Sequence, residues 1–237
     1  MAYLDTFEPL KVTAQFRTNP ICDARLPLDG LLWYQAHRLA LGPEQATLPG
    51  GNPGKNNKMH MPLKMINPGT PDWYFACSWA QPRQWWIGEG TDHWNKRFDS
   101  AFAELINFGK RRGKVIIEQG KYKAYHMPVF YKVAKQVHWY CVGDKIEIKQ
   151  LLSTMTNVGK KTSQGWGRVL WAVESWHSDW SVWHDGELMR GVPQTDALAS
   201  IKKHGKFIPF DIVNYGLRPS YYRRKNQRML AVPNAKG

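Results

Sequence analysis

Two hydrophobic patterns alternate along the chain and predict its first elements. Apolar and polar side chains alternate over residues 10–16, which predicts a half-buried strand with Leu10, Val12, Ala14 and Phe16 on one face. A helix is predicted next, because Asp29 is a residue type that caps helices and Gly42-Pro43 stops them. Its apolar side is formed by Leu28, Leu31, Leu32, Ala36 and Leu39.

The same order of strand and helix returns in the second half. Residues 137–142 predict a strand, and Asp144 begins a helix in which Glu147 supplies the reciprocal acid of a capping box. Gly159 follows this helix where a left-handed residue is needed, and residues 169–173 predict another strand. The helix has one apolar face, formed by Ile148, Leu151, Leu152, Met155 and Val158.

The resulting order, β-α and later β-α-β, is that of an RRM-like (ferredoxin-like) sheet. We therefore predict an α+β fold: an antiparallel sheet with helices on one face, large insertions and a single elaborated domain over residues 1–237. Residues 43–58 are rich in Gly, Pro and Asn and predict a mobile loop. Residues 73–80 and 114–118 predict strands, and residues 100–108 a short helix.

Charge is abundant and unevenly distributed. The chain has 33 Lys and Arg against 19 Asp and Glu, a net charge of +14, so its field attracts polyanions. Residues 109–135 contain eight basic residues and one acid, and residues 200–237 contain nine and one. We predict a long basic hairpin in the first segment, with Gly120 near its turn, and a basic C-terminal extension in the second. RNA or DNA is favoured over a membrane, since no apolar run reaches the length of a spanning helix.

Cysteine usage and the N-terminus give no sign of secretion. Cys22, Cys77 and Cys141 are scattered and form no Cys-x-x-Cys pair, which argues against a disulfide framework or a structural zinc site. The first ten residues contain acids and no signal-like hydrophobic region. We expect a cytoplasmic protein without a cofactor.

The segment from Gly159 to Val169 joins three glycines and three cations between a predicted helix and a predicted strand. Glycines allow main-chain amides to converge on a phosphate, and the cations add charge. The order of elements argues against a P-loop, because a P-loop opens a helix, whereas this loop follows one. The alternative is a surface connection with solvated lysines. The candidate RNA-binding residues here are Gly159, Lys160, Lys161, Ser163, Gly165, Trp166, Gly167 and Arg168.

Two groups of residues carry a family resemblance. The glycine-rich loop ends in Gly165-Trp166-Gly167-Arg168-Val169, and the N-terminal part contains Pro20-Ile21-Cys22-Asp23 followed by Pro27-Leu28-Asp29-Gly30-Leu31-Leu32. Together they resemble CRISPR-associated RAMP proteins, and in particular the small RAMP subunit of type IV CRISPR effector complexes. The resemblance covers the first strand and helix and roughly residues 137–173.

This resemblance implies an RNA-binding subunit. Such a protein grips the five-prime, repeat-derived handle of CRISPR RNA, contacts the backbone and large subunits, and meets target DNA only through the complex. The family's thumb hairpin maps onto residues 110–135 here, and its glycine-rich loop packs beside the RNA. The usual RRM aromatic signature is absent, so RNA is expected along the loops. Candidate contacts in the hairpin are Lys110, Arg111, Arg112, Lys121 and Lys123.

Aromatic residues provide further candidates, since the chain has 12 Trp and 10 Tyr. Trp166 could stack on a base or pack the loop onto the sheet. A cluster of Tyr221, Arg223, Arg224 and Lys225 favours contact with RNA or a partner subunit over a merely solvated face.

Catalysis is the main rival interpretation. Some RAMP relatives cleave precursor RNA without metal, which makes His37, Tyr34 and His126 candidate catalytic residues. Their spacing does not require catalysis, so we expect no enzyme. His177, Asp179 and His184 could bind a metal, but neighbouring tryptophans favour packed aromatic strands. A metal-independent CRISPR RNA-processing endoribonuclease and a generic RNA- or DNA-binding protein are the alternative functions.

Overall fold

A computed structural model of the chain describes residues 7–23, 25–42, 59–81, 86–107, 115–205 and 209–234. The loop predicted at residues 43–58 lies outside these ranges, as do Lys110, Arg111 and Arg112 of the predicted hairpin. Lys121 lies within a short helix, but its side chain is outside the described part.

The central sheet contains β1 (Glu8–Phe16), β6 (Gln136–Gly143) and β7 (Val169–Ser175), antiparallel in the order β6-β1-β7. Residues 76–81 add an irregular strand along the free edge of β6. Isolated bridges join Cys77 to Cys141 and Gln81 to His138, and the Ser78 amide donates to the Tyr140 carbonyl at 2.7 Å. The order β7-β1-β6-(76–81) is that of a ferredoxin-like sheet, and the predicted α+β fold is confirmed.

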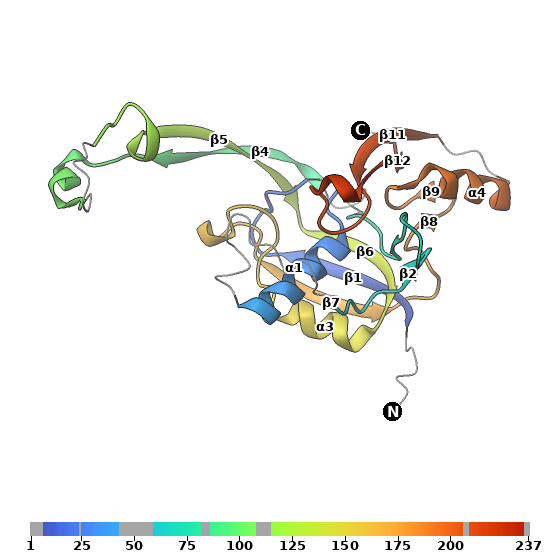
Figure 1. The fold of residues 1–237 in the computed structure, drawn as a ribbon. Coiled ribbons are helices and arrows are strands. Elements are labelled where there is room, and N and C mark those ends of the chain that lie inside the picture. Colours follow the sequence, from blue (N-terminus) through green and yellow to red (C-terminus); the bar gives the residue numbers. More distant parts are fainter. Residues whose placement is uncertain are drawn as a thin grey trace.

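Two helices, α1 (Leu28–Leu41) and α3 (Lys145–Ser153), cover one face of this sheet (Figure 1). The sheet and the helices share one hydrophobic core, because alternate residues of β1 point toward the apolar stripes of both helices. The most buried members include Leu10, Val12, Ala14, Leu28, Leu32, Trp139, Ile148 and Leu152.

The first helix differs from its prediction in two respects. Pro27, not Asp29, is its N-cap, and Asp29 is fully buried in the first turn. Leu39 is 56% exposed, whereas Gln35 is buried, so the buried stripe is rotated relative to the predicted apolar face. The rotation follows from packing, because Asp29 and Gln35 are buried beside partners that lie far away in the sequence.

The second helix begins as predicted and ends earlier. The Asp144 carboxylate accepts from the amides of Ile146 and Glu147 at 2.8 and 2.9 Å. The reciprocal half of the predicted capping box is absent, because the Asp144 amide donates to Pro62 and the Glu147 carboxylate faces His60. The helix ends at Ser153, so Gly159 is not its C-terminal residue, although Met155 and Val158 are buried.

A long hairpin arm extends from the body (Figure 1). It pairs β4 (Trp86–Lys96) with β5 (Tyr125–Ala134), and two 3-10 helices, η1 (Ser100–Leu105) and η2 (Gly120–Tyr122), lie between them. The prediction of a hairpin within residues 109–135 is therefore wrong in its first strand and its turn, and residues 115–118 form no strand. The segment predicted as a helix at 100–108 contains η1. The pattern of β4 gave no strand signal, because none of the described side chains on this strand is buried, so burial imposes no alternation.

The predicted C-terminal extension is a folded sheet. β10 (Val192–Pro193), β12 (Gln227–Pro233) and β11 (Phe210–Gly216) pair in that order beside α4 (Gln194–His204). A second hydrophobic cluster fills it, and the buried strand β12 contributes Leu230, Ala231 and Val232. The remaining elements are β2 (Met65–Ile66), β3 (Tyr74–Phe75), η3 (Thr162–Gln164), β8 (Trp183–His184), β9 (Glu187–Leu188) and η4 (Arg224–Asn226). The strand predicted at 73–80 is thus divided between β3 and the irregular edge strand.

A buried polar cluster joins the two hydrophobic clusters. The Arg190 side chain is 1% exposed and donates to the carbonyls of Phe75 and Leu217 at 2.6 and 2.8 Å. Its Nη1 lies 3.6 Å from Asp29 Oδ2, and the Tyr221 hydroxyl donates to Asp29 Oδ1. Burial raises the pKa of Asp29, and the guanidinium of Arg190 opposes that rise. Arg190 therefore fixes the C-terminal sheet against α1 and the edge of the central sheet.

Candidate nucleic-acid interface

The glycine-rich loop, residues 159–168, lies between α3 and β7 and leads directly into β7. Gly159, Gly165 and Gly167 have φ angles of 98°, 88° and 64°, and Lys161 also lies in the left-handed region at 56°. A Cβ on Gly167 would overlap the Val158 carbonyl, and one on Gly159 would lie 2.5 Å from the Ile21 carbonyl oxygen. Glycine is therefore required for close packing of the loop on neighbouring backbone.

Five of the ten amides in this loop donate to partners within the protein. Lys160 donates to the Ile21 carbonyl at 2.8 Å, Gly167 donates to the Asn19 carbonyl at 3.1 Å, and Arg168 donates to the Thr18 hydroxyl at 2.9 Å. The amides of Gln164 and Gly165 are used inside the loop. These five amides are therefore not available to a phosphate, and for the rest of the loop the convergence of amides on a phosphate stays a prediction. The side chains of Lys160 and Arg168 are exposed and bring positive charge to the loop surface.

The loop meets the arm through two contacts. Lys161 Nζ lies 4.4 Å from the ring centroid of Trp94 on β4, and the Trp166 ring lies 5.1 Å from Tyr131 on β5. Tyr131 faces Gly90 across the hairpin, where a Cβ would overlap its ring. Trp166 therefore packs against the arm and is half-buried, and its stacking on a base stays a prediction.

Both contacts fall on one face of the arm, because side chains alternate along each strand. Trp94 and Lys96 share this face of β4, and their register partners on β5 are Met127 and Tyr125. The rings of Trp94 and Tyr125 stack at 6.4 Å, and Lys96 and Lys123 each lie 5.9 Å from the Tyr125 ring. We call this set the aromatic–lysine strip: Trp94, Lys96, Lys123, Tyr125, Tyr131, Lys161 and Trp166.

Most of the strip was not predicted from the sequence. Lys123, Lys161 and Trp166 were among the candidates, whereas Trp94, Lys96, Tyr125 and Tyr131 were not. One signal was available in the sequence: Trp94 and Lys96 are two residues apart, so they share a face of a strand. Tyr125 and Tyr131 are six residues apart and likewise share a face of a later strand. The register between strands that are far apart in sequence carries the rest of the information.

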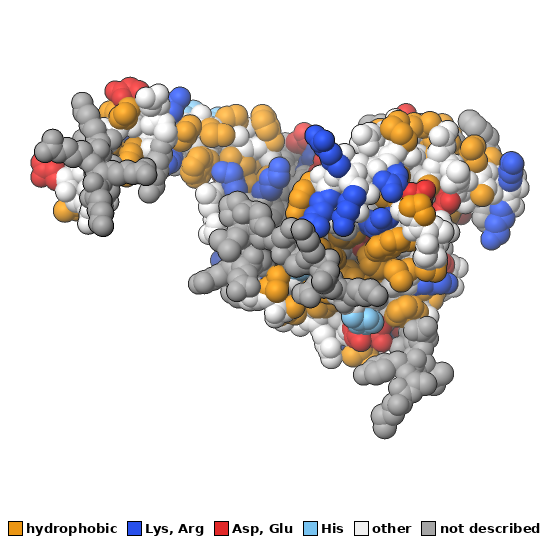
Figure 2. All heavy atoms as spheres, in the orientation of Figure 1, with side chains coloured by type: hydrophobic (Ala, Val, Ile, Leu, Met, Phe, Trp, Pro, Cys, Tyr) orange, Lys and Arg blue, Asp and Glu red, His pale blue; other side chains and the backbone are white. Residues whose placement is uncertain are grey.

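The C-terminal aromatic–basic cluster is divided between the interior and the surface. Tyr221 is half-buried and its hydroxyl donates to Asp29, and burial raises the pKa of that hydroxyl. The neighbouring Tyr222 is 76% exposed. The cations Arg224 and Lys225 are also exposed. Figure 2 shows Lys and Arg side chains gathered at the centre of this face, over the segment that contains η4.

The three candidate catalytic residues do not lie in one place. His37 is buried on α1, where its Nδ1 lies 2.9 Å from the Trp33 carbonyl and burial lowers its pKa. Tyr34 is largely exposed on the same helix. His126 lies on the arm, exposed, with its ring stacked 4.5 Å from His93 and Nδ1 2.5 Å from Asn95 Oδ1.

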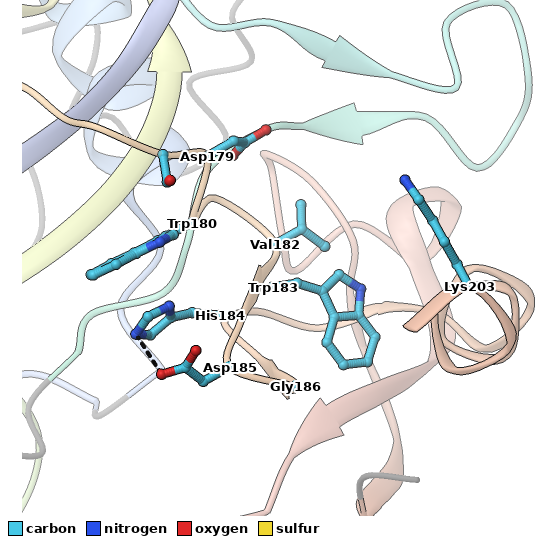
Figure 3. Close-up of a pocket in the computed structure, with 9 residues that line it drawn as sticks. Asp179, Trp180, Val182, Trp183, His184, Asp185, Gly186 and Lys203 are labelled. Atoms are coloured by element: carbon cyan, nitrogen blue, oxygen red, sulfur yellow. Dashed lines mark ion pairs between the residues drawn. The ribbon is translucent and has the colours of Figure 1, made fainter. Parts of the chain in front are cut away.

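A pocket of about 600 Å³ lies between the β8–β9 hairpin and α4 (Figure 3). The Trp180 ring stacks on His184 at 3.6 Å, and His184 Nε2 lies 3.5 Å from Asp185 Oδ2. Asp179 and His184 lie on opposite sides of Trp180 in this view. Across the described ranges, no three His, Cys, Asp or Glu side chains gather closely enough to hold a metal ion, and these aromatic residues pack on one another.

Comparison with protein families identifies the chain. The model of the family described as CRISPR type IV associated protein Csf3 matches residues 91–232, which is more than half of the chain. The match includes most of the arm, the glycine-rich loop and the C-terminal sheet, and begins after the first strand and helix. A search of curated proteins found no match. Within the described part, no helix has the length and apolar character needed to cross a membrane. The chain therefore belongs to the CRISPR type IV associated protein Csf3 family, which makes it a type IV CRISPR-associated, RAMP-like subunit.

Proposed function

We propose that the chain is the guide-RNA-binding subunit of a cytoplasmic type IV effector ribonucleoprotein, and that it holds the five-prime, repeat-derived handle. The observation that carries this proposal is the aromatic–lysine strip, where Lys161 meets Trp94 and Trp166 meets Tyr131. Family membership supports the CRISPR context, and the excess of basic residues supports an anionic partner.

The strip offers both interactions that single-stranded RNA uses. Half-exposed rings stack on bases, which contributes about 1–3 kcal/mol per base by alanine substitution. Lysine side chains beside those rings pair with phosphates and release counterions. In this arrangement the RNA lies along the loop-facing side of the arm, with Lys160 and Arg168 at the loop end.

The arm's outer end suggests a contact with neighbouring protein subunits. Among the described residues between β4 and β5, four large apolar side chains are exposed: Phe102, Leu105, Ile116 and Ile117. Exposed apolar groups of this kind mark protein interaction sites. We propose that this end docks on a backbone or large subunit, so that target DNA is reached only through the assembled complex.

The proposed role is binding without cleavage. An RNA-cleaving site needs an acid and a base within hydrogen-bond reach of one ribose and its leaving group. His37 is buried on α1 in the body, whereas His126 is on the arm, which favours the non-catalytic role. Incubation of the protein with repeat-containing RNA in EDTA tests this. A discrete cut with a cyclic-phosphate end that is lost in His126→Ala would establish the nuclease instead.

The direct test is the RNA that purifies with the protein. We expect one small RNA population with a constant five-prime end when the protein is expressed with its CRISPR array, and sequencing will identify it. Bulk cellular RNA of mixed sequence would favour a generic nucleic-acid-binding protein.

Charge substitutions test where the RNA lies. Replacing both Lys160 and Lys161 by Ala should weaken RNA binding and reduce the salt dependence by about 0.7 per lost phosphate contact. The matched control is Lys202→Ala with Lys203→Ala, which removes the same charge from exposed positions on α4. Binding is measured over a series of salt concentrations. Equal slopes for the two double variants would show that the loop makes no special phosphate contact.

A further inference from the structure

A second pocket, of about 510 Å³, separates α1 from the glycine-rich loop. Its volume falls within the range of about 300–1,000 Å³ that is typical of small-molecule sites. One wall carries Tyr34, Gln35 and Arg38 from α1, and the opposite wall carries Thr162 and Ser163 from the loop. Between them lies an apolar floor of Leu26, Leu31, Met155 and Val158.

Gln35 is the unusual residue of this pocket. It is 1% exposed, and its Nε2 donates to Thr154 Oγ1 at 2.5 Å. The Thr154 hydroxyl itself donates to the Leu151 carbonyl at 2.9 Å, so it can only accept from Gln35. This chain of hydrogen bonds fixes the orientation of the Gln35 amide: the nitrogen Nε2 faces Thr154, and the oxygen Oε1 points the other way.

Gln35 Oε1 is buried and accepts no hydrogen bond from any residue in the described ranges. A buried acceptor in this condition is costly, and such groups usually have a partner in the functional state. Gln35 is among the residues that line the pocket, so a ligand there with an N–H donor directed at Oε1 would supply that partner. An N–H donor on a flat, uncharged group suits this site, because the floor is apolar and the exposed cation Arg38 lies at the rim.

We propose that this pocket takes one extruded base of the bound RNA strand, through an N–H donor on the edge of the base. A base provides a flat apolar body and a donor edge, and its phosphate remains at the rim, near Arg38 and the loop lysines. The proposal rests on the proposed function, because the glycine-rich loop that forms one wall is also the loop that would hold RNA. It adds base recognition to a surface whose other contacts are electrostatic or stacking.

The test compares short oligomers of adenylate, cytidylate and uridylate with an abasic oligomer of the same length, at one salt concentration. The abasic strand keeps every phosphate and loses every base. We expect wild-type protein to bind at least one base-bearing oligomer better than the abasic one. In Gln35→Met, which has a similar shape without the acceptor, that oligomer should bind about fivefold to tenfold more weakly, and the abasic oligomer should bind as before.

A second pair of variants keeps the test valid if Gln35→Met does not fold. Ser163→Trp fills the pocket from an exposed loop position, and Gln164→Trp places the same side chain at the next exposed position, which does not line the pocket. Only Ser163→Trp should remove the base preference. An unchanged preference in both Gln35→Met and Ser163→Trp would overturn the proposal, as would equal binding of a free mononucleotide and its oligomer.

Different results would reject the RNA-binding function and the base pocket. If none of the oligomers binds, the abasic strand included, the proposed RNA-binding function itself is wrong. If all bind with affinities that do not depend on Gln35 or on the pocket, the RNA-binding function stands and only the base pocket is rejected.

Discussion

The glycine-rich loop and the C-terminal segment 218–228 have similar composition, and the fold uses them differently. In the loop, Lys161 and Trp166 contact rings on the arm and remain partly exposed. In the C-terminal segment, Tyr221 donates to the buried Asp29, and Arg228 Nε lies 2.7 Å from Asp72 Oδ1. The first set of side chains stays at the surface, and much of the second set holds the protein together.

The difference lies in the partners that the fold brings to each segment. Carboxylates face Tyr221 and Arg228, and an arginine paired with a carboxylate has less charge to offer a phosphate. Rings face Lys161, and a cation above a ring remains a cation that a phosphate can approach. We therefore expect the nucleic-acid surface at the loop, whose neighbouring segment supplies rings, and not at residues 218–228, where Tyr221 and Arg228 meet acids.

The largest expected effect is on the buried pair that stabilises the C-terminal segment. Arg190→Met leaves the buried Asp29 carboxylate without its cation, and removing one partner of a buried pair costs about 3–5 kcal/mol. Urea unfolding should show this loss. The control Arg224→Met removes an arginine from an exposed position, where the change should stay within about 0.5 kcal/mol.

A double replacement sharpens the same test. Asp29→Leu together with Arg190→Met removes both charges, so no uncompensated charge remains in the interior, and the protein should regain part of the lost stability. A double variant less stable than Arg190→Met alone would show that Asp29 matters mainly through its other partner, the Tyr221 hydroxyl.

A smaller effect is expected at the tyrosine pair of the same segment. Tyr221→Phe deletes the donor to a buried carboxylate, and hydrogen bonds to charged groups contribute about 1.5–3 kcal/mol. Tyr222→Phe, at the exposed neighbouring position, should leave the free energy of unfolding unchanged. Neither change should alter the salt dependence of RNA binding. Weaker RNA binding by Tyr221→Phe at unchanged stability would remove the distinction between the two segments.

The sequence predicted the parts of the fold that local signals specify. Alternation over residues 10–16 fixed the inward face of β1, because only one face of that strand meets the helices. Asp144 predicted the start of α3, since its carboxylate can reach the next amides from that position alone. These predictions depend on neighbours within a few residues, where the chain itself limits the geometry.

The arm, the strip and the buried cluster depend on distant pairing. Trp94 stacks with Tyr125 only because β4 and β5 pair in one register, and a shift by one residue would place these rings on opposite faces. Asp29 looked like a helix cap because its buried partners, Arg190 and Tyr221, are far away in sequence. The glycine-rich loop was found by composition, but the use of its amides could not be predicted without the segment 18–21 that receives them.

The smallest expected effect is a difference in RNA affinity between variants on the two faces of the arm. Trp94→Leu removes a half-buried ring of the strip and the surface over which Lys161 lies, so RNA binding should weaken by about 1 kcal/mol, the low end for one stacked base. The matched control is Phe130→Leu: this ring is 69% exposed and pairs with Thr91 on the opposite face, so its loss should leave binding unchanged. Affinity for one short RNA, with the free energy of unfolding measured in parallel, decides between them. Equal weakening by both variants would mean that the arm binds RNA without a preferred face, and that the contact between the loop and the arm serves packing alone.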